Sequence, residues 1–137
     1  MDANLKREII LDHYQNPFHK ETKGDDFTRV NTNNVSCIDD INVFIKLSGN
    51  IIEDAYFDGE ACAISTSSTS IMLKKIIGKT KEEALTLTDE FDNMIYEREY
   101  NKEILGEALV YDEIYKQESR KNCATLPYRA LRKALED

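Results

Sequence analysis

Three cysteines and one aspartate are the residues of this 137-residue chain whose types suit joint chemistry. Cys37 and Asp39 lie two positions apart, just before an alternating apolar run that predicts a strand from Ile41. In extended chain, residues i and i+2 point to the same side, so a thiol and a carboxylate would share one face. Cys62 and Cys123 lie far from this pair in the sequence.

Both distant cysteines lie where a helix is predicted to begin. Cys62 follows Gly59 at the start of one predicted helix, and Cys123 stands just ahead of another. A helix N-terminus carries partial positive charge and lowers the pKa of a thiol, which favours the thiolate that binds metals or attacks sulfur.

Three sulfurs and one carboxylate oxygen would suit a tetrahedral zinc site. The chain has no CxxC pair, and free cysteine is also a common small core residue, so three unrelated cysteines are the alternative on pattern alone. Asp40 competes with Asp39 as the oxygen ligand, but strand parity with Cys37 favours Asp39. In a chain that we expect to be intracellular, an odd number of cysteines argues against a disulfide framework.

The first element predicted along the chain is a helix. Residues 4–15 carry apolar side chains at helical spacing, and this helix is predicted to end before Pro17. His13 lies on its apolar side, so we interpret it as a packed or partner-facing histidine rather than a ligand. His19 falls in a polar loop at 18–26 and is expected to be solvated.

A β-hairpin with one buried face is predicted next. Residues 41–47 alternate, "SGN" has turn chemistry, and a second apolar run follows. In that second run we expect Ile51, Ala55 and Phe57 to share the buried face. A weaker strand is predicted near Phe27–Asn31.

A helix is predicted from about Cys62 to Ile77, although its middle reads "STSSTS". The alternative is a flexible polar linker, but apolar residues at helical spacing flank the run, and small side chains would let a helix lie close to a sheet. Thr80 and Glu83 form a capping box for the next helix.

The second half of the chain is predicted to be mainly helical. Residues 88–116 show helical patterns with interruptions, and a last helix is predicted from Thr125 with Pro127 in its first turn. Strands followed by helices indicate an α+β fold: a small antiparallel sheet of about three strands packed against several helices. The length predicts a single domain over residues 1–137.

The composition narrows the function classes. The net charge is −8 and no basic stripe is visible, which argues against a nucleic-acid partner. No apolar run approaches the roughly 20 residues that span a bilayer, and the first residues lack the pattern of a signal peptide. We therefore expect a cytoplasmic protein with no membrane partner.

Five stretches, spread in order over nearly the whole chain, resemble the IscU/NifU-N family of iron–sulfur cluster assembly proteins, and most of all its SufU branch. They are "LDHYQNP" (11–17, family D-H-Y-x-N-P), "NNVSCIDDI" (33–41, N-N-P-x-C-G-D), "FDGEACAISTSSTSIM" (57–72, F-x-G-x-G-C-x-I-S-x-A-S-x-S-x-M), "GKTKEEAL" (78–85) and "SRKNCATLPYRAL" (119–131, R-x-x-C-A-T-L-x-W-x-A-L).

Two features of the sequence place the resemblance in the SufU branch. The interval of 61 positions between Cys62 and Cys123 is longer than in the scaffold branch and resembles the SufU insertion. The scaffold branch has a histidine directly before its last cysteine, whereas this chain has Asn122, as in SufU. The family arginine three positions before that cysteine is present as Arg120.

The resemblance implies zinc-dependent sulfur transfer. Cys37 would accept persulfide sulfur from a PLP-dependent, SufS-like cysteine desulfurase and pass it to downstream iron–sulfur assembly proteins, so the chain would act as co-substrate and activator of that enzyme. One zinc per chain would be held by Cys37, Asp39, Cys62 and Cys123, with a partner histidine replacing Cys37 during transfer. Arg120 would pair with Asp39 or steady the thiolate, and a surface salt bridge is its alternative.

Two other roles keep the same fold. The chain could be an IscU-type scaffold that assembles a transient cluster on Cys37, Cys62 and Cys123, or a purely structural zinc domain. The chain also departs from the family pattern: Ile38 and Ala61 replace glycines, and Tyr128 replaces a common tryptophan. Ile38 raises a question of backbone freedom, because a β-branched residue resists angles that glycine accepts.

Overall fold

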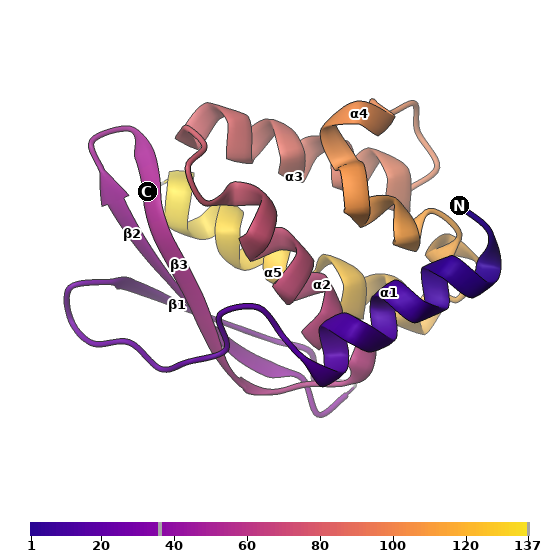
Figure 1. Ribbon diagram of the computed structural model, residues 1–137, viewed down its shortest axis with the longest axis horizontal. Helices are drawn as coiled ribbons and strands as arrows, with labels where there is room; N and C mark the ends of the chain where they lie inside the picture. Colours follow the sequence, from indigo (N-terminus) through magenta and orange to yellow (C-terminus); the bar gives the residue numbers. More distant parts are fainter. Residues whose placement is uncertain (36, 137) are drawn as a thin grey trace.

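The computed structural model describes residues 1–35 and 37–136 and has an α+β architecture, with the helices gathered beside a small sheet (Figure 1). The sheet is antiparallel with strand order β1-β2-β3, formed by β1 (Thr28–Asn33), β2 (Asp40–Ser48) and β3 (Ile51–Glu60). The helical elements are α1 (Ala3–Gln15), α2 (Ala63–Ile76), α3 (Lys81–Ile95), α4 (Lys102–Leu105), the 3₁₀ turns η1 (Gly106–Tyr111) and η2 (Ile114–Lys116), and α5 (Glu118–Glu136). The predicted fold class is confirmed. Within the described residues, no helix is long and apolar enough to cross a membrane.

The hairpin forms as predicted, except for the first residue of its second strand. A register shift between Lys46 and Leu47 leaves Glu53 unpaired, as in a β-bulge. The bulge reverses the alternation of β3, so Ile52 is fully buried with Ala55 and Phe57, while Ile51 is 40% exposed. The expectation that Ile51 shares the buried face was wrong for this reason.

The "STSSTS" run lies in the interior of the molecule, which rules out a flexible linker. All six of its residues are buried in α2, and several of their hydroxyls bond to neighbouring elements. Ser67 shares a 2.5 Å hydrogen bond with the Tyr111 hydroxyl, and Ser68 donates to the Ala124 carbonyl at 2.6 Å. These bonds attach α2 to η1 and α5 because a buried hydroxyl needs a partner.

Helix α5 begins at Glu118, seven residues before the predicted start at Thr125. Pro127 therefore lies in the interior of the helix rather than in its first turn. Proline has no N–H to donate to the carbonyl of Cys123, four residues earlier. The Ser65 hydroxyl of α2, 3.1 Å from that carbonyl, can take the place of the missing donor.

Helix α3 packs against the second half of α5. Thr80 and Glu83 form the predicted capping box at its start. Farther along, Phe91 stacks on Tyr128 with ring centroids 3.9 Å apart. The remainder of the predicted 88–116 segment is the short α4 with η1 and η2, as expected for an interrupted helical region.

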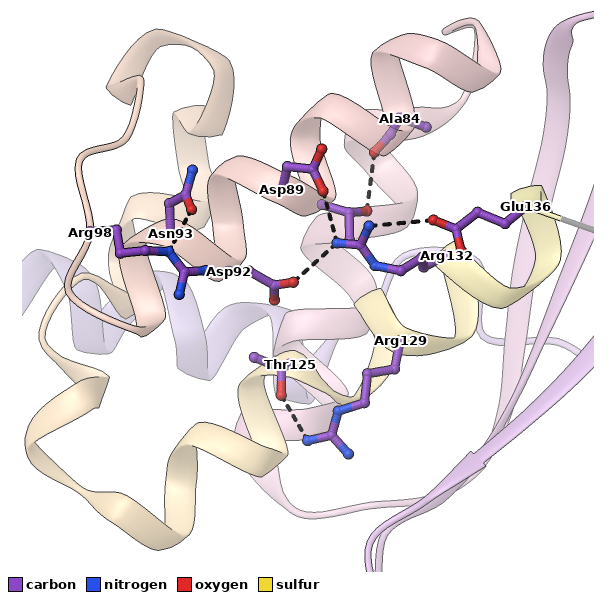
Figure 2. Close-up of polar contacts among 10 residues, drawn as sticks. Ala84, Asp89, Asp92, Asn93, Arg98, Thr125, Arg129, Arg132 and Glu136 are labelled. Carbon is purple, nitrogen blue, oxygen red and sulfur yellow. Dashed lines mark hydrogen bonds and ion pairs between the residues drawn. The ribbon is translucent and has the colours of Figure 1, made fainter.

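Arg132 joins α3 to the end of α5 through carboxylates (Figure 2). Its guanidinium lies 3.0 Å from Asp89, 3.1 Å from Asp92 and 3.5 Å from Glu136. Burial raises the pKa of Asp92, and the adjacent guanidinium opposes that rise. This network lies on the far half of α5, away from Cys123.

The two histidines have structural partners. His13 is buried in α1 and bonds to Ser70 at 2.7 Å and to Glu107 at 2.5 Å, so the prediction of a packed histidine is confirmed. His19 was expected to be solvated, but its ring stacks between Phe18 and Tyr56. The loop before β1 thus packs against the sheet instead of remaining free in solvent.

Candidate metal centre

The structure brings together the four residues that the sequence singled out. One potential ligand atom from each of Cys37, Asp39, Cys62 and Cys123 lies within 4.8 Å of all the others. They come from the β1–β2 loop, the start of α2 and the first half of α5. Three segments distant in sequence therefore meet at one end of the sheet.

The loop between β1 and β2 places Cys37 and Asp39 by a turn rather than by an extended strand. The Cys37 N–H donates to the Asn34 carbonyl, and the Asn34 N–H donates to the Asp39 carbonyl, both at 3.0 Å. Strand parity was thus the wrong reason for expecting these side chains together. Asp40 begins β2 and accepts a hydrogen bond from Asn31 instead.

Asp39 is 2% exposed and lies at the centre of the group. Its Oδ1 accepts the Cys62 N–H at 2.7 Å, and its Oδ2 accepts the Ser65 hydroxyl at 2.6 Å. Burial alone would raise the pKa of Asp39, but these hydrogen bonds outweigh it and hold the pKa below its usual value. The structure thus keeps a buried carboxylate in its ionised form.

Cys62 occupies the N-cap position of α2, as predicted. Its Sγ accepts the Ser65 N–H at 3.5 Å and lies 3.8 Å from Asp39 Oδ2. An N-cap side chain that accepts such a bond takes the place of the serine or aspartate usually found there. The helix N-terminus thus points a partial positive charge at this sulfur.

Cys123 lies in a different environment from the one predicted. It is 2% exposed and sits inside α5, not ahead of its first turn. Burial, with the neighbouring Cys62 and Asp39, raises the pKa of its thiol to about 12. A helix N-terminus therefore cannot explain how Cys123 would become a thiolate, whereas a bound cation would supply the missing stabilisation.

Gly59 lets β3 pass close to the residues at the start of β2. It pairs with Ile41, has a φ of +107°, and a Cβ at this position would lie 2.1 Å from the Asp40 carbonyl oxygen. Only glycine combines this backbone angle with this approach. The close contact fixes the start of β2, and with it Asp39, next to the chain that leads into α2.

The donor set fits a tetrahedral metal. With Zn–S near 2.3 Å and Zn–O near 2.0 Å, a tetrahedral site separates sulfur from oxygen by about 3.5 Å. Asp39 Oδ1 lies 3.6 Å from Cys37 Sγ, and Asp39 Oδ2 lies 3.8 Å from Cys62 Sγ. Each of these sulfurs is therefore within a few tenths of an ångström of that separation from one oxygen of the carboxylate.

Comparison with known proteins identifies the family. The model of the NifU-like N-terminal domain matches residues 5–137. This chain belongs to that family.

Its relatives include a protein named as a zinc-dependent sulfurtransferase and proteins named as iron–sulfur cluster assembly scaffolds. Zinc-dependent sulfurtransferase SufU of Bacillus subtilis (strain 168) is 41% identical over 132 residues, which covers 96% of this chain and 89% of SufU. Iron–sulfur cluster assembly scaffold protein IscU of Streptococcus pyogenes serotype M1 is 38% identical over 135 residues, covering 97% and 84%. The crystal structure of FiSufU from Fervidobacterium islandicum AW-1, named as an iron–sulfur cluster assembly scaffold protein for the SUF system, superposes with a TM-score of 0.85 at 32% identity, covering 93% and 94%. The predicted SufU-like membership is confirmed.

The two replaced glycines of the family pattern do not require a glycine backbone here. Among the described residues, the non-glycine positions with positive φ are His19 and Glu97. Ile38 and Ala61 are thus outside the left-handed region. The side chain of Ile38 is 68% exposed, so the substitution changes the surface beside Cys37 rather than the packing.

Two exposed residues of α5 near Cys123, Arg120 and Asn122, differ in their side-chain hydrogen bonds. Arg120 is exposed, and its side chain has no hydrogen bond or ion pair within residues 1–35 and 37–136, so neither predicted pairing is formed. Asn122, which stands where the scaffold branch has histidine, is exposed and accepts a hydrogen bond from Arg129 at 3.0 Å.

Sequence reasoning missed Ser65 as a member of the site. It lies three positions after Cys62, where a serine N–H meets an N-cap side chain. That spacing was a usable signal for the bond between the Ser65 N–H and Cys62. The contact between its hydroxyl and Asp39 depends on the fold and had no local signal.

Proposed function

We propose that this chain is a zinc-dependent sulfurtransferase of iron–sulfur cluster assembly, which accepts persulfide sulfur on Cys37 from a PLP-dependent, SufS-like cysteine desulfurase. The observation that carries the proposal is the position of Cys37: this residue lies in the β1–β2 loop and is exposed, whereas Cys62 is half-buried and Cys123 is buried. Similarity to a zinc-dependent sulfurtransferase over 96% of the chain supports it.

Zinc bound by Cys37, Asp39, Cys62 and Cys123 would stabilise the thiolate forms of its cysteine ligands. Asp39 keeps its carboxylate ionised through the hydrogen bonds from Cys62 and Ser65. The buried residues thus hold the site, while the exposed Cys37 is the one that a second protein can reach.

The transfer itself is an exchange without net oxidation. The Cys37 thiolate attacks the outer sulfur of the donor persulfide, a new S–S bond forms on Cys37, and the S–S bond of the donor breaks. The donor cysteine leaves as a thiolate and takes up a proton. Arg120, exposed and free of partners among the described residues, could meet the negative charge of the incoming persulfide.

The scaffold role is the second candidate. The three thiols also lie close enough together to hold iron, and IscU of Streptococcus pyogenes is 38% identical to this chain. Asn122 argues against this role, because it replaces the histidine of the scaffold pattern.

Metal analysis followed by persulfide detection tests the proposal. Purified protein and the variants Cys37→Ala, Asp39→Ala, Cys62→Ala and Cys123→Ala are analysed for zinc, iron and acid-labile sulfide. About one zinc in the unmodified protein and less in the variants is expected. After incubation with a cysteine desulfurase and cysteine, mass spectrometry should show one added sulfur on Cys37. Iron with sulfide and no persulfide on Cys37 would instead establish the scaffold role.

A further inference from the structure

Ser65 contacts three of the four residues of the cluster. Its hydroxyl lies 2.6 Å from Asp39 Oδ2, 3.1 Å from the Cys123 carbonyl and 3.6 Å from Cys62 Sγ. The residue is fully buried in the first turn of α2. We propose that Ser65 is a positioning residue, which holds the Asp39 carboxylate toward the three thiols. The inference rests on the proposed metal site.

The two oxygens of Asp39 have one short donor each. The Cys62 N–H holds Oδ1 at 2.7 Å, and the Ser65 hydroxyl holds Oδ2. Two donors on two oxygens fix the rotation of a carboxylate, whereas a single donor leaves it free to turn. Without the hydroxyl, Oδ2 would lose its short donor and keep the weak contact with Cys62 Sγ at 3.8 Å.

The Cys123 carbonyl gives the Ser65 hydroxyl a second acceptor. A serine hydroxyl has one hydrogen, so it donates to either Asp39 or this carbonyl at any moment. Pro127 leaves the carbonyl without its usual helical donor. The hydroxyl oxygen of Ser65 is thus located between α5 and Asp39 Oδ2, within reach of both acceptors.

Ser68 is a matched control. It is fully buried in the same helix, one turn after Ser65, and donates to the Ala124 carbonyl of α5 at 2.6 Å. Removal of its hydroxyl also breaks a bond between α2 and α5. Among its described contacts none reaches Asp39, so Ser68 reports on helix packing alone.

The experiment compares Ser65→Ala with Ser68→Ala. Zinc affinity is measured by competition with a chromogenic chelator, with thermal melts to verify folding. Removal of a residue that supports a metal ligand typically costs 10–100-fold in affinity, and about that loss is expected for Ser65→Ala. Ser68→Ala should stay within about twofold of the unmodified protein. Equal losses in both variants, or unchanged affinity in Ser65→Ala, would overturn the proposal.

A second measurement needs no metal. In metal-free protein, hydrogen exchange of the Cys62 amide reports how firmly Asp39 Oδ1 is held. Exchange should accelerate at least about tenfold in Ser65→Ala and remain unchanged in Ser68→Ala, and equal exchange in all three proteins would overturn the role of Ser65. If the unmodified protein binds no zinc, the proposed function fails, while this measurement still decides the role of Ser65.

Discussion

Cys37 and Cys123 bring the same chemical group to the cluster from opposite environments. Cys37 lies in an exposed loop next to Val35, which is 96% exposed, and Ile38, which is 68% exposed. Cys123 is 2% exposed within α5. We call the loop around Cys37 the exposed side of the cluster, and Asp39 with Cys123 the buried side.

This difference indicates that the proposed centre binds its metal mainly on the buried side and meets its partner on the exposed side. The buried side contains the ionised carboxylate of Asp39 and a thiol whose pKa is raised to about 12. Such a pair would bind a cation well and react poorly with other molecules. The exposed side offers a thiol to a partner but has little packing of its own. Predictions on each side should therefore differ in kind.

Thiol alkylation should show the largest contrast. In metal-free, reduced protein at pH 7.5, the raised pKa of Cys123 leaves very little of this thiol as thiolate, and burial blocks access as well. We expect Cys123 to react with iodoacetamide at least about 100-fold more slowly than Cys37. Peptide mapping by mass spectrometry over time measures both rates in one sample.

Denatured protein is the control for the alkylation experiment, because all three cysteines should then react at similar rates. Zinc should protect the cysteines in the folded protein. Comparable rates at Cys37 and Cys123 in the folded, metal-free protein would show that the two sides do not differ.

Metal removal should have the next largest effect, through stability. At free zinc about a thousand times its dissociation constant, binding contributes about 4 kcal/mol to the free energy of unfolding. For a chain of this size, that corresponds to a Tm lower by about 10–20 °C after chelation. Thermal melts with and without chelator measure the shift, and Cys62→Ser should abolish most of it. If chelation leaves the Tm of the unmodified protein unchanged, the buried residues do not bind a metal that stabilises the fold.

Local sequence signals sufficed for Cys62 in the site and for most of the elements. The capping box at Thr80 and the N-cap position of Cys62 follow from spacing within a few residues, and both are present in the structure. The hairpin follows from alternation and turn chemistry. In each of these cases the partners of a bond lie close together in the chain, so the pattern contains the information.

The errors arose where distant segments decide the outcome. Pro127 indicated a helix start, but Ser65 of α2 offers a donor to the Cys123 carbonyl, and α5 extends back to Glu118. Ile51 was predicted to be buried, but the bulge at Glu53 reverses which side chains of β3 face the core, and Ile51 is exposed. The sequence pattern of one segment does not show which hydrogen-bond donors a distant segment brings to it. Nor does it show where the pairing register between two strands shifts.

Gly59→Ala should lower both the free energy of unfolding and the zinc affinity. The new Cβ would lie 2.1 Å from the Asp40 carbonyl oxygen, on a residue whose φ is +107°. We expect a loss of about 2–4 kcal/mol in urea unfolding, since backbone strain and steric overlap combine. Zinc affinity should fall as well, because displacement of Asp40 moves Asp39.

Gly49→Ala is the matched control for this substitution. Its φ is also positive, at +60°, but nothing lies within 4 Å of a Cβ there. It should cost about 1 kcal/mol from the backbone angle alone and leave zinc affinity unchanged. Equal effects of the two substitutions on zinc affinity would mean that the approach of β3 to Asp40 does not position the site.

Ile38→Gly should have the smallest effect and tests the exposed side. The substitution restores the family glycine beside Cys37, yet Ile38 has an ordinary backbone angle and an exposed side chain. We expect the free energy of unfolding to change by less than about 1 kcal/mol and zinc affinity to stay within about twofold. The fully buried Ile41→Ala is the contrast, because a cavity in the core should cost about 2–5 kcal/mol. A large gain of zinc affinity in Ile38→Gly would show that the loop is strained around Cys37 and that the exposed side helps to set the metal site.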